Sequence, residues 1–407
     1  MGTSRRPVLW TGIAATVVAL VVALVWFSSG PSADEPPAGS SAHESVAVLS
    51  AVLGGSGPGS LLSAKTMPGL STDLANQVHA ARVVYRSTSG DGQPTVVSGS
   101  VFVPSGEPPN GGWPVVSFGH GTTGIDRSCA PSSSDSLLGY AEAVGALVLR
   151  GYAVALADYQ GLGAPGVHPY TDSRTAGLNM IDAVRALRAT FRYVSDRWGA
   201  FGGSQGGGAA WAADEQAGTY APELKLVGAV AVSPIANVTG LVDKAQRGGL
   251  TTEQKVVLSG IVKSLSLLHS DINRDDYRRG TGARNPDVDL PCSAANVGSP
   301  AGTASTLAPD DIAPRTPVAA ERLRRYLAQW ALPQRALSAP LYVWYGGADR
   351  FIDASWTANA ITRACSLGGT VAVVFEPSKG HGEINYDDQF NWLTDRFAER
   401  PVVDACA

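Results

Sequence analysis

Charged residues are scarce in this chain. Only 16% of its 407 residues are Asp, Glu, Lys or Arg, and the formal net charge is −4. The sequence has no long run of charge of one sign, so nucleic acid is not expected as a partner. The length allows one large domain with an insertion, or two domains of ordinary size.

Cysteine is rare as well. The chain has four cysteines far apart in sequence, with no C-x-x-C pair to indicate a zinc or redox site. They are Cys129, Cys292, Cys365 and Cys406. Two disulfides are predicted, as in many exported proteins, and the spacing alone leaves three pairings open. Four buried free thiols are the alternative.

The first residues are interpreted as a targeting segment outside the fold. Arg5 and Arg6 precede an uncharged stretch over residues 8–27, and a Pro- and Ser-rich spacer follows. Twenty apolar residues suffice to span a bilayer, and the basic flank favours an N-terminus inside with the rest exported. Residues 1–44 are therefore predicted to be a membrane anchor or a cleaved signal, with membrane association through 8–27.

Short apolar strands and amphipathic helices alternate along most of the remaining chain. This alternation predicts an α/β fold with a mostly parallel sheet covered by helices on both faces. A first hairpin is expected at 81–87 and 94–104. Further strands are expected at 113–119, 153–158, 198–204, 226–235, 340–347 and 370–377, and helices at 135–152, 175–191, after residue 204, at 355–365 and at the C-terminus.

One block interrupts this alternation. Residues 236–333 contain no strand-like run, and the helical stretch 252–272 places Val257, Ile261 and Leu265 on one face. We therefore expect a core over 45–235, a helical cap or lid over 236–333, and the second part of the core over 334–407.

The stretch "GAFGGSQGGGAA" predicts a reactive serine. Ser204 lies where a strand should turn sharply into a helix, and such a turn leaves no room for side chains at Gly202 and Gly206. The turn would lift the hydroxyl above the sheet edge, next to the free N–H groups of a helix start. A phosphate-binding loop is disfavoured, because the required Gly-Lys-Ser/Thr ending is missing.

A serine nucleophile needs a histidine as base and a carboxylate that orients the histidine. His381 follows the last expected strand between two glycines, whereas His269 lies at the expected cap helix and is interpreted as a surface residue. Asp349 directly follows the preceding strand and is the predicted acid. Asp353 is the alternative acid and is better explained as a helix N-cap.

The loop "GHGTTG" after an early strand is expected to complete an oxyanion hole. Its donors would be the backbone N–H groups of Thr122 and Gln205, while His120 is interpreted as structural. The loop "DYQGLG" from Asp158 is interpreted as architectural. The acidic stretch from Asp271 lacks the glycine and glutamate of a calcium loop, so no metal is predicted, and no cofactor is implied.

With these motifs in place, the chain resembles the secretory lipase family of α/β-hydrolases, typified by fungal lipase A-type enzymes. The resemblance runs from about residue 57 to the C-terminus and includes "GPGSLLSA", "GHGTTG", "DYQGLG", "GGSQGG", "GGADRFI" and "GHGEI". It implies a triad of Ser204, Asp349 and His381 and a helical cap over an acyl pocket. It also implies the disulfides Cys129–Cys292 and Cys365–Cys406.

The sequence thus predicts an exported serine esterase, in the first instance a lipase acting on fatty acyl esters. A short-chain esterase, an acyltransferase or a peptidase could use the same triad. A non-catalytic binding protein with the same fold is the alternative from another class.

Overall fold

The computed structural model describes residues 45–284, 292 and 303–407. The predicted targeting segment 1–44, including its apolar stretch 8–27, lies outside these described residues. Among the residues that are described, no helix combines the length and the apolar character needed to cross a membrane.

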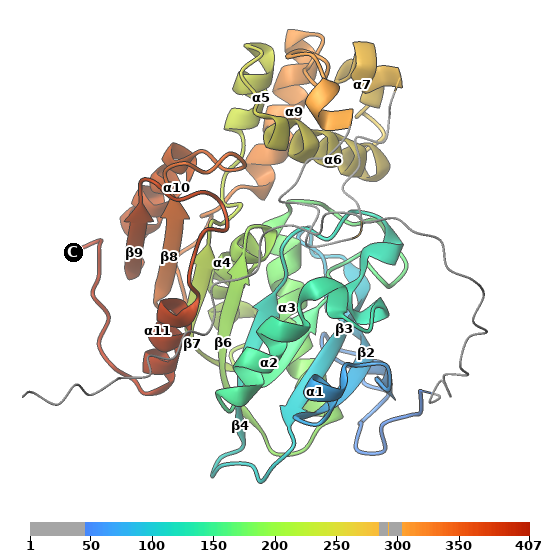
Figure 1. Ribbon diagram of the computed structural model, residues 1–407, viewed down its shortest axis with the longest axis vertical. Helices are drawn as coiled ribbons and strands as arrows, with labels where there is room; N and C mark the ends of the chain where they lie inside the picture. The colour runs from blue at the N-terminus through green and yellow to red at the C-terminus, as the bar shows by residue number, and fades with distance from the viewer. Residues whose placement is uncertain (1–44, 285–291, 293–302) are drawn as a thin grey trace, which may run out of the picture. The chain divides into compact units, whose positions relative to one another are not determined.

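The strands of the described chain form one mixed sheet with the order β1-β2-β3-β5-β4-β6-β7-β8-β9 (Figure 1). The first three strands and the β3–β5 pair are antiparallel, and all neighbours from β5 to β9 are parallel. The mostly parallel sheet predicted from the sequence is therefore confirmed. The bounds are β1 Leu61–Thr66, β2 Val78–Thr88, β3 Pro94–Pro104, β4 Trp113–Gly119, β5 Ala153–Ala157, β6 Val194–Gly203, β7 Lys225–Val232, β8 Leu341–Gly346 and β9 Val371–Glu376.

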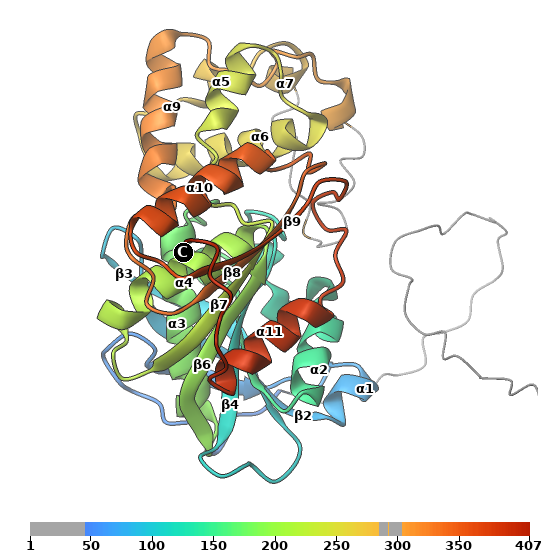
Figure 2. The ribbon, with the colours of Figure 1, turned by 90° about the vertical axis from the view of Figure 1, so that its left-hand side faces the viewer.

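Helices cover both faces of the sheet (Figure 2). One face carries α3 (Ser173–Thr190), α4 (Gln205–Tyr220) and α10 (Ala354–Ser366). The other carries α1 (Thr72–Ala75), α2 (Ala141–Leu149) and α11 (Asp387–Phe397). Side chains alternate along the buried strands, as the period of two requires. In β5 the alanines face α3, whereas Val154 and Leu156 face α2.

Small residues allow α3 and α4 to pack closely on each other. A Cβ on Gly177 of α3 would lie 2.6 Å from the backbone nitrogen of Ala213 in α4, so a side chain at this position would push the two helices apart. Because α4 begins directly after Ser204, its packing also fixes the position of that serine.

A second group of helices lies beyond the carboxyl ends of the parallel strands (Figure 1). It comprises α5 (Gly240–Gln246), α6 (Thr252–Leu268), α7 (Gly280–Arg284) and α9 (Pro317–Trp330), and we call these helices the cap. They surround an apolar cluster of their own, to which Val257, Ile261 and Leu265 of α6 contribute fully or nearly fully buried side chains. Thr251 and Gln254 form a capping box that starts α6.

One expected helix begins later than the sequence indicates. The helix expected over 135–152 starts only at Ala141, and short 3₁₀ turns precede it. Leu137 and Leu138 adopt positive φ angles of 52° and 51°, which are incompatible with a continuous right-handed helix. The tertiary position of this loop beside β4 therefore overrides the apolar pattern.

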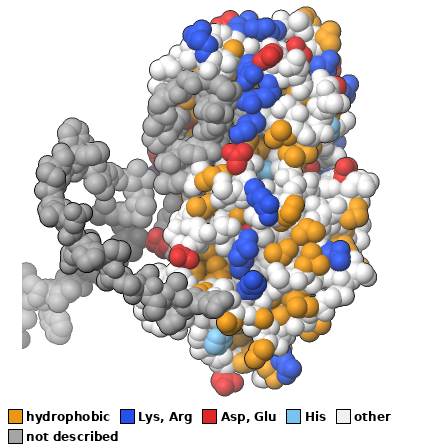
Figure 3. Space-filling view, turned by 90° about the vertical axis from the view of Figure 1, so that its right-hand side faces the viewer, with side chains coloured by type: hydrophobic (Ala, Val, Ile, Leu, Met, Phe, Trp, Pro, Cys, Tyr) orange, Lys and Arg blue, Asp and Glu red, His pale blue; other side chains and the backbone are white. Residues whose placement is uncertain are grey.

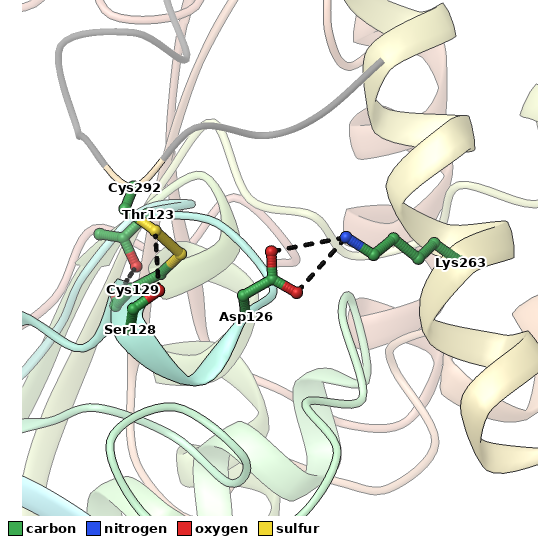
Figure 4. The surroundings of a disulfide bond; sticks show 6 residues. All are labelled: Thr123, Asp126, Ser128, Cys129, Lys263 and Cys292. Atoms are coloured by element: carbon green, nitrogen blue, oxygen red, sulfur yellow. Dashed lines mark hydrogen bonds and ion pairs between the residues drawn. A yellow bond between two sulfur atoms is a disulfide. The ribbon is translucent and has the colours of Figure 1, made fainter. Parts of the chain in front are cut away.

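Two disulfides are present in the described structure. They join Cys129 to Cys292 and Cys365 to Cys406, which is the pairing that the family resemblance implies. The first links the loop after β4 to the segment between α7 and α9, and Figure 4 shows its surroundings. The second fastens the C-terminal tail to α10.

The described part of the surface in Figure 3 mixes charges of both signs with scattered hydrophobic side chains. On this face Lys and Arg side chains lie in a loose row along the middle of the described surface, and Asp and Glu side chains lie beside them at several points.

Candidate active site

Ser204 lies between the end of β6 and the start of α4. Its backbone angles, φ 58° and ψ −118°, are unusual for a residue with a side chain and are typical of a strained functional turn. A Cβ on Gly202 would overlap the carbonyl oxygen of Gly206, and a Cβ on Gly206 would overlap that of Gly119. The tight turn therefore requires glycine at both positions.

Asp349 and His381 are brought together from two different strand ends. Asp349 follows β8 and His381 follows β9, and His381 Nδ1 lies 2.7 Å from Asp349 Oδ2. The Asp349 side chain is only 2% exposed, and its other oxygen accepts hydrogen bonds from the N–H groups of Phe351 (2.7 Å) and Ile352 (3.0 Å). The carboxylate is thus fixed in place before any substrate binds.

The hydrogen bond to Asp349 determines the tautomer of His381. A carboxylate only accepts, so Nδ1 carries the proton and the neutral ring keeps a lone pair on Nε2. Nε2 is buried and has no hydrogen-bond partner among the described residues. The ring of Phe351 lies against the imidazole with centroids 4.8 Å apart. This arrangement leaves Nε2 available to accept a proton.

Ser204 and His381 border the same turn after β7. The hydroxyl of Ser233 donates to the carbonyl oxygen of His381 at 2.8 Å, and the N–H of Ile235 donates to that of Ser204 at 3.1 Å. The two side chains do not hydrogen-bond to each other, because His381 Nε2 has no partner among the described residues. Catalytic hydrogen bonds are often loose without substrate and tighten in the complex.

Both predicted oxyanion residues are buried beside Ser204. Gln205 is the first residue of α4, whose first-turn N–H groups have no acceptor within the helix. Thr122 follows Gly121, and a Cβ on Gly121 would lie only 3.9 Å from Ser204 Cβ. The loop that carries Thr122 therefore approaches the serine closely.

His120 and Asp158 have structural partners. His120 is fully buried, its ring nitrogens face the carbonyl oxygens of Gly121 (2.6 Å) and Asp158 (3.2 Å), and its ring stacks on Tyr159. Burial lowers the pKa of His120. The Asp158 carboxylate binds the N–H of Ser132 at 2.9 Å, and burial raises its pKa. Neither side chain is free for catalysis.

Asp353 occupies the expected N-cap position of α10, but its side chain makes no capping hydrogen bond. The predicted N-cap position of Asp353 is therefore confirmed. The carboxylate instead receives hydrogen bonds from Lys244 (2.9 Å) of α5 and Gln254 (2.8 Å) of α6. These two residues of the helical cap therefore hold the Asp353 carboxylate away from the N-terminus of α10.

His269 follows the last residue of α6 and stacks on Tyr326 of α9, with ring centroids 4.2 Å apart. The nearby acidic stretch is also occupied, because Asp271 accepts a hydrogen bond from Tyr326 at 2.7 Å and pairs with Arg322 and Arg325. Within the described ranges, no group of three or more His, Cys, Asp or Glu side chains could hold a metal ion.

The sequence analysis missed two residues beside the predicted oxyanion residues, His168 and Tyr170. His168 Nε2 lies 2.9 Å from Gln205 Nε2, and the Tyr170 hydroxyl lies 3.1 Å from that of Thr122. Both residues come from the loop between β5 and α3. No local motif marks them, because their partners are 37 and 48 residues away in sequence.

With this geometry in view, the sequence pattern of the secretory lipase family matches residues 140–405. The chain belongs to the secretory lipase family. The family assignment made from the motifs is confirmed.

Two curated relatives match part of the chain. A probable inactive lipase of Mycobacterium tuberculosis is 30% identical over 44% of this chain and 43% of its own length. A probable trichothecene esterase of Stachybotrys chartarum is 26% identical over 50% of this chain and 45% of its own length. The chain thus spans less than half the length of the curated relatives that it matches.

Solved structures share the fold. Lipase A of Candida antarctica in its closed state superposes with a TM-score of 0.69 at 17% identity, covering 86% of this chain and 85% of that one. The rice cell wall degrading esterase LipA of Xanthomonas oryzae superposes with a TM-score of 0.61 at 21% identity, covering 84% and 97%. The α/β-hydrolase fold predicted from the sequence is confirmed by these neighbours.

Proposed function

We propose that this secretory lipase family member hydrolyses carboxylic esters through an acyl-serine intermediate, with fatty acyl esters as its substrate class. The proposal rests on the hydrogen bonding of the two ring nitrogens of His381. Its Nδ1 is held by Asp349 at 2.7 Å, and its buried Nε2 has no partner among the described residues. A ring held in this way can act as the base for a nearby serine.

The reaction would proceed in two halves. Ser204 Oγ attacks the carbonyl carbon while its proton moves to His381 Nε2, and Asp349 stabilises the imidazolium. The N–H groups of Gln205 and Thr122 hold the tetrahedral oxyanion. The proton then passes to the leaving alcohol, and the acyl-serine remains. A water molecule attacks this ester, its proton passes through the imidazole to the serine oxygen, and the acid leaves.

The two disulfides support the further proposal that the protein works outside the cytoplasm. Disulfides persist in oxidising compartments and are rare in the reducing cytosol. Because Cys129 and Cys292 are 163 residues apart and Cys365 and Cys406 are 41 apart, the pairs join separate elements rather than neighbouring turns. We also propose the division into a core over 45–235 and 334–407 and a cap over 236–333.

Labelling by a fluorophosphonate probe tests the nucleophile. The wild type should react at Ser204, and Ser204→Ala should lose both the label and esterase activity, by a factor of about 10⁶ in kcat if the triad acts as a unit. A wild type that stays unlabelled would favour the alternative function, a non-catalytic binding protein. The mycobacterial relative, named a probable inactive lipase, raises the same alternative.

Activity against p-nitrophenyl esters of increasing chain length tests the substrate class. A rise toward long chains, and a further rise with emulsified substrate, is the result expected of a lipase. Activity confined to short chains in solution would identify an esterase instead. Hydrolysis of peptide amides, or transfer to an added alcohol in preference to water, would point to a peptidase or an acyltransferase.

A further inference from the structure

We propose that Ser264 of the cap helix α6, acting through His168 and Tyr170, is a positioning residue for the oxyanion hole. The inference rests on the proposed function and adds to it a direct mechanical link between the cap and the groups that would stabilise the transition state. Neither Ser264 nor the two loop residues would touch the reacting atoms.

Ser264 holds the tripeptide His168–Pro169–Tyr170 from both ends. Its hydroxyl donates to the carbonyl oxygen of His168 at 2.6 Å and accepts from the N–H of Tyr170 at 3.0 Å. The side chain is buried, so no water competes for either bond. A hydroxyl has a single proton to donate, and here that proton is used on the loop rather than on the carbonyl groups of α6.

The tripeptide in turn holds both predicted oxyanion residues. The Tyr170 hydroxyl lies 3.1 Å from Thr122 Oγ1, and His168 Nε2 lies 2.9 Å from Gln205 Nε2. His168 Nδ1 donates to the carbonyl oxygen of Gln160 at 2.9 Å, so the neutral ring must accept from Gln205. One loop therefore fixes the side chains of the two residues whose N–H groups are the proposed oxyanion donors.

His168 is suited to a fixed structural role. Burial lowers its pKa to about 4, so the ring stays neutral throughout the range in which an esterase works. A ring that does not change its charge keeps its hydrogen bonds while His381 gains and loses a proton. His168 therefore holds Gln205 without taking part in the proton transfers.

Two further contacts attach the loop after β4, which carries Thr122, to other segments of the chain. Lys263, next to Ser264 in α6, pairs with Asp126 at 3.3 Å, and the Cys129–Cys292 disulfide joins the same loop to the segment between α7 and α9 (Figure 4). Thr123, which follows Thr122, donates to the carbonyl oxygen of Cys129 at 2.8 Å. A displacement of α6 would therefore be transmitted to the oxyanion loop.

Tyr170→Phe is the first test, because it removes only the hydroxyl that reaches Thr122. Tyr277→Phe is the matched control, since Tyr277 is equally buried in the cap and its hydroxyl binds the Ala319 carbonyl oxygen at 3.1 Å. We expect Tyr170→Phe to lower kcat about tenfold, a fraction of the loss for removing an oxyanion donor itself, with KM within about twofold. Tyr277→Phe should leave both parameters unchanged.

Ser264→Ala tests the link to the cap. It should lower kcat by a similar factor, whereas Ser266→Ala should not, because that hydroxyl donates to the Lys263 carbonyl oxygen of its own helix. Affinity for a trifluoromethyl ketone, which forms a tetrahedral oxyanion on the serine, should fall in parallel with kcat. Ser264→Thr, which keeps the hydroxyl, should restore part of both.

The outcomes separate the two proposals. If the wild type hydrolyses esters, and Tyr170→Phe and Ser264→Ala match their controls in kcat and ketone affinity, the link to the cap is overturned and the proposed function stands. If the wild type neither hydrolyses esters nor reacts with a fluorophosphonate, the proposed function fails and the link fails with it. Equal unfolding temperatures of each variant and its control show that a loss of kcat is not a loss of fold.

Discussion

Asp349 and Asp353 lie on one loop, but only Asp349 reaches His381. Asp349 Oδ2 lies 2.7 Å from His381 Nδ1, whereas the Asp353 carboxylate binds Lys244 at 2.9 Å and Gln254 at 2.8 Å. The first carboxylate orients the proposed base, and the second fastens the cap to the core. Mutation of Asp349 should therefore lower the activity, whereas mutation of Asp353 should lower the stability.

Asp349→Asn should lower kcat by about 10⁴ and leave the fold intact. The amide would keep the side-chain volume but no longer accept a charge-assisted hydrogen bond from His381, so the wrong tautomer would present a proton to the serine. Asp353→Asn should retain most of the activity and lower the unfolding temperature, because a partly buried ion pair is lost. Initial rates on a p-nitrophenyl ester and thermal unfolding measure the two effects.

Equal losses of activity in the two variants would contradict this assignment. A still lower activity for Asp353→Asn than for Asp349→Asn would make Asp353 the acid, and the observed contact with His381 would then have no catalytic role.

Gly206→Ala should abolish activity and reduce the yield of folded protein. The added Cβ would overlap the carbonyl oxygen of Gly119 and lie 2.8 Å from that of His120, and backbone atoms cannot move aside as a side-chain tip can. Gly145→Ala in α2 is the control, since its Cβ would meet only Leu74 at 3.8 Å and should add up to about 1 kcal/mol of helix stability. Circular dichroism and active-site titration distinguish loss of fold from loss of chemistry.

The alternating pattern predicted the parallel sheet because each buried strand gives a short apolar run of its own. Ser204, His381 and Asp349 could be proposed in the same way, since each follows a strand and has its own glycine or turn signal beside it. The structure adds what no local pattern contains. His168 contacts Gln205 across 37 residues and Ser264 contacts His168 across 96, and these contacts exist only after the sheet and the cap have assembled.

Local signals also failed where packing decided the outcome. The helix expected from residue 135 is replaced at its start by turns in which Leu137 and Leu138 adopt positive φ angles. Strand β1 has no strict alternation of apolar and polar residues and was not predicted, although it pairs with β2 at the edge of the sheet. Pairing with an existing strand edge compensates for its weak sequence signal.

The Cys365–Cys406 disulfide should stabilise the fold without affecting catalysis. It closes a loop of 41 residues, for which chain entropy gives about 4 kcal/mol. The variant with both cysteines changed to serine should unfold at a lower denaturant concentration and keep its kcat at room temperature. A large loss of kcat with unchanged stability would show instead that the C-terminal tail acts on the active site.

Asp214, a fully buried residue of α4, should make the protein less stable as the pH rises. Burial is the main cause that raises its pKa to about 8, and Glu215 beside it is raised to about 7, also chiefly by burial. The unfolded chain loses the Asp214 proton near pH 4, while the folded chain keeps it until about pH 8. Between these values the unfolded state binds fewer protons, so the free energy of unfolding falls with rising pH and levels off above about pH 8.

Asp214→Asn should flatten this decline. Oδ1 of Asp214 accepts the N–H groups of Ser338 and Ala339, each at 2.8 Å, and an amide oxygen can accept the same two bonds without a titrating proton. Unfolding temperatures measured from pH 5 to 8 should therefore decrease less in the variant than in the wild type, with a residual slope from Glu215. Asp73→Asn, an exposed acid at the start of α1, is the control and should reproduce the wild-type slope. Identical slopes for Asp214→Asn and the wild type would mean that Asp214 is ionised in the folded protein.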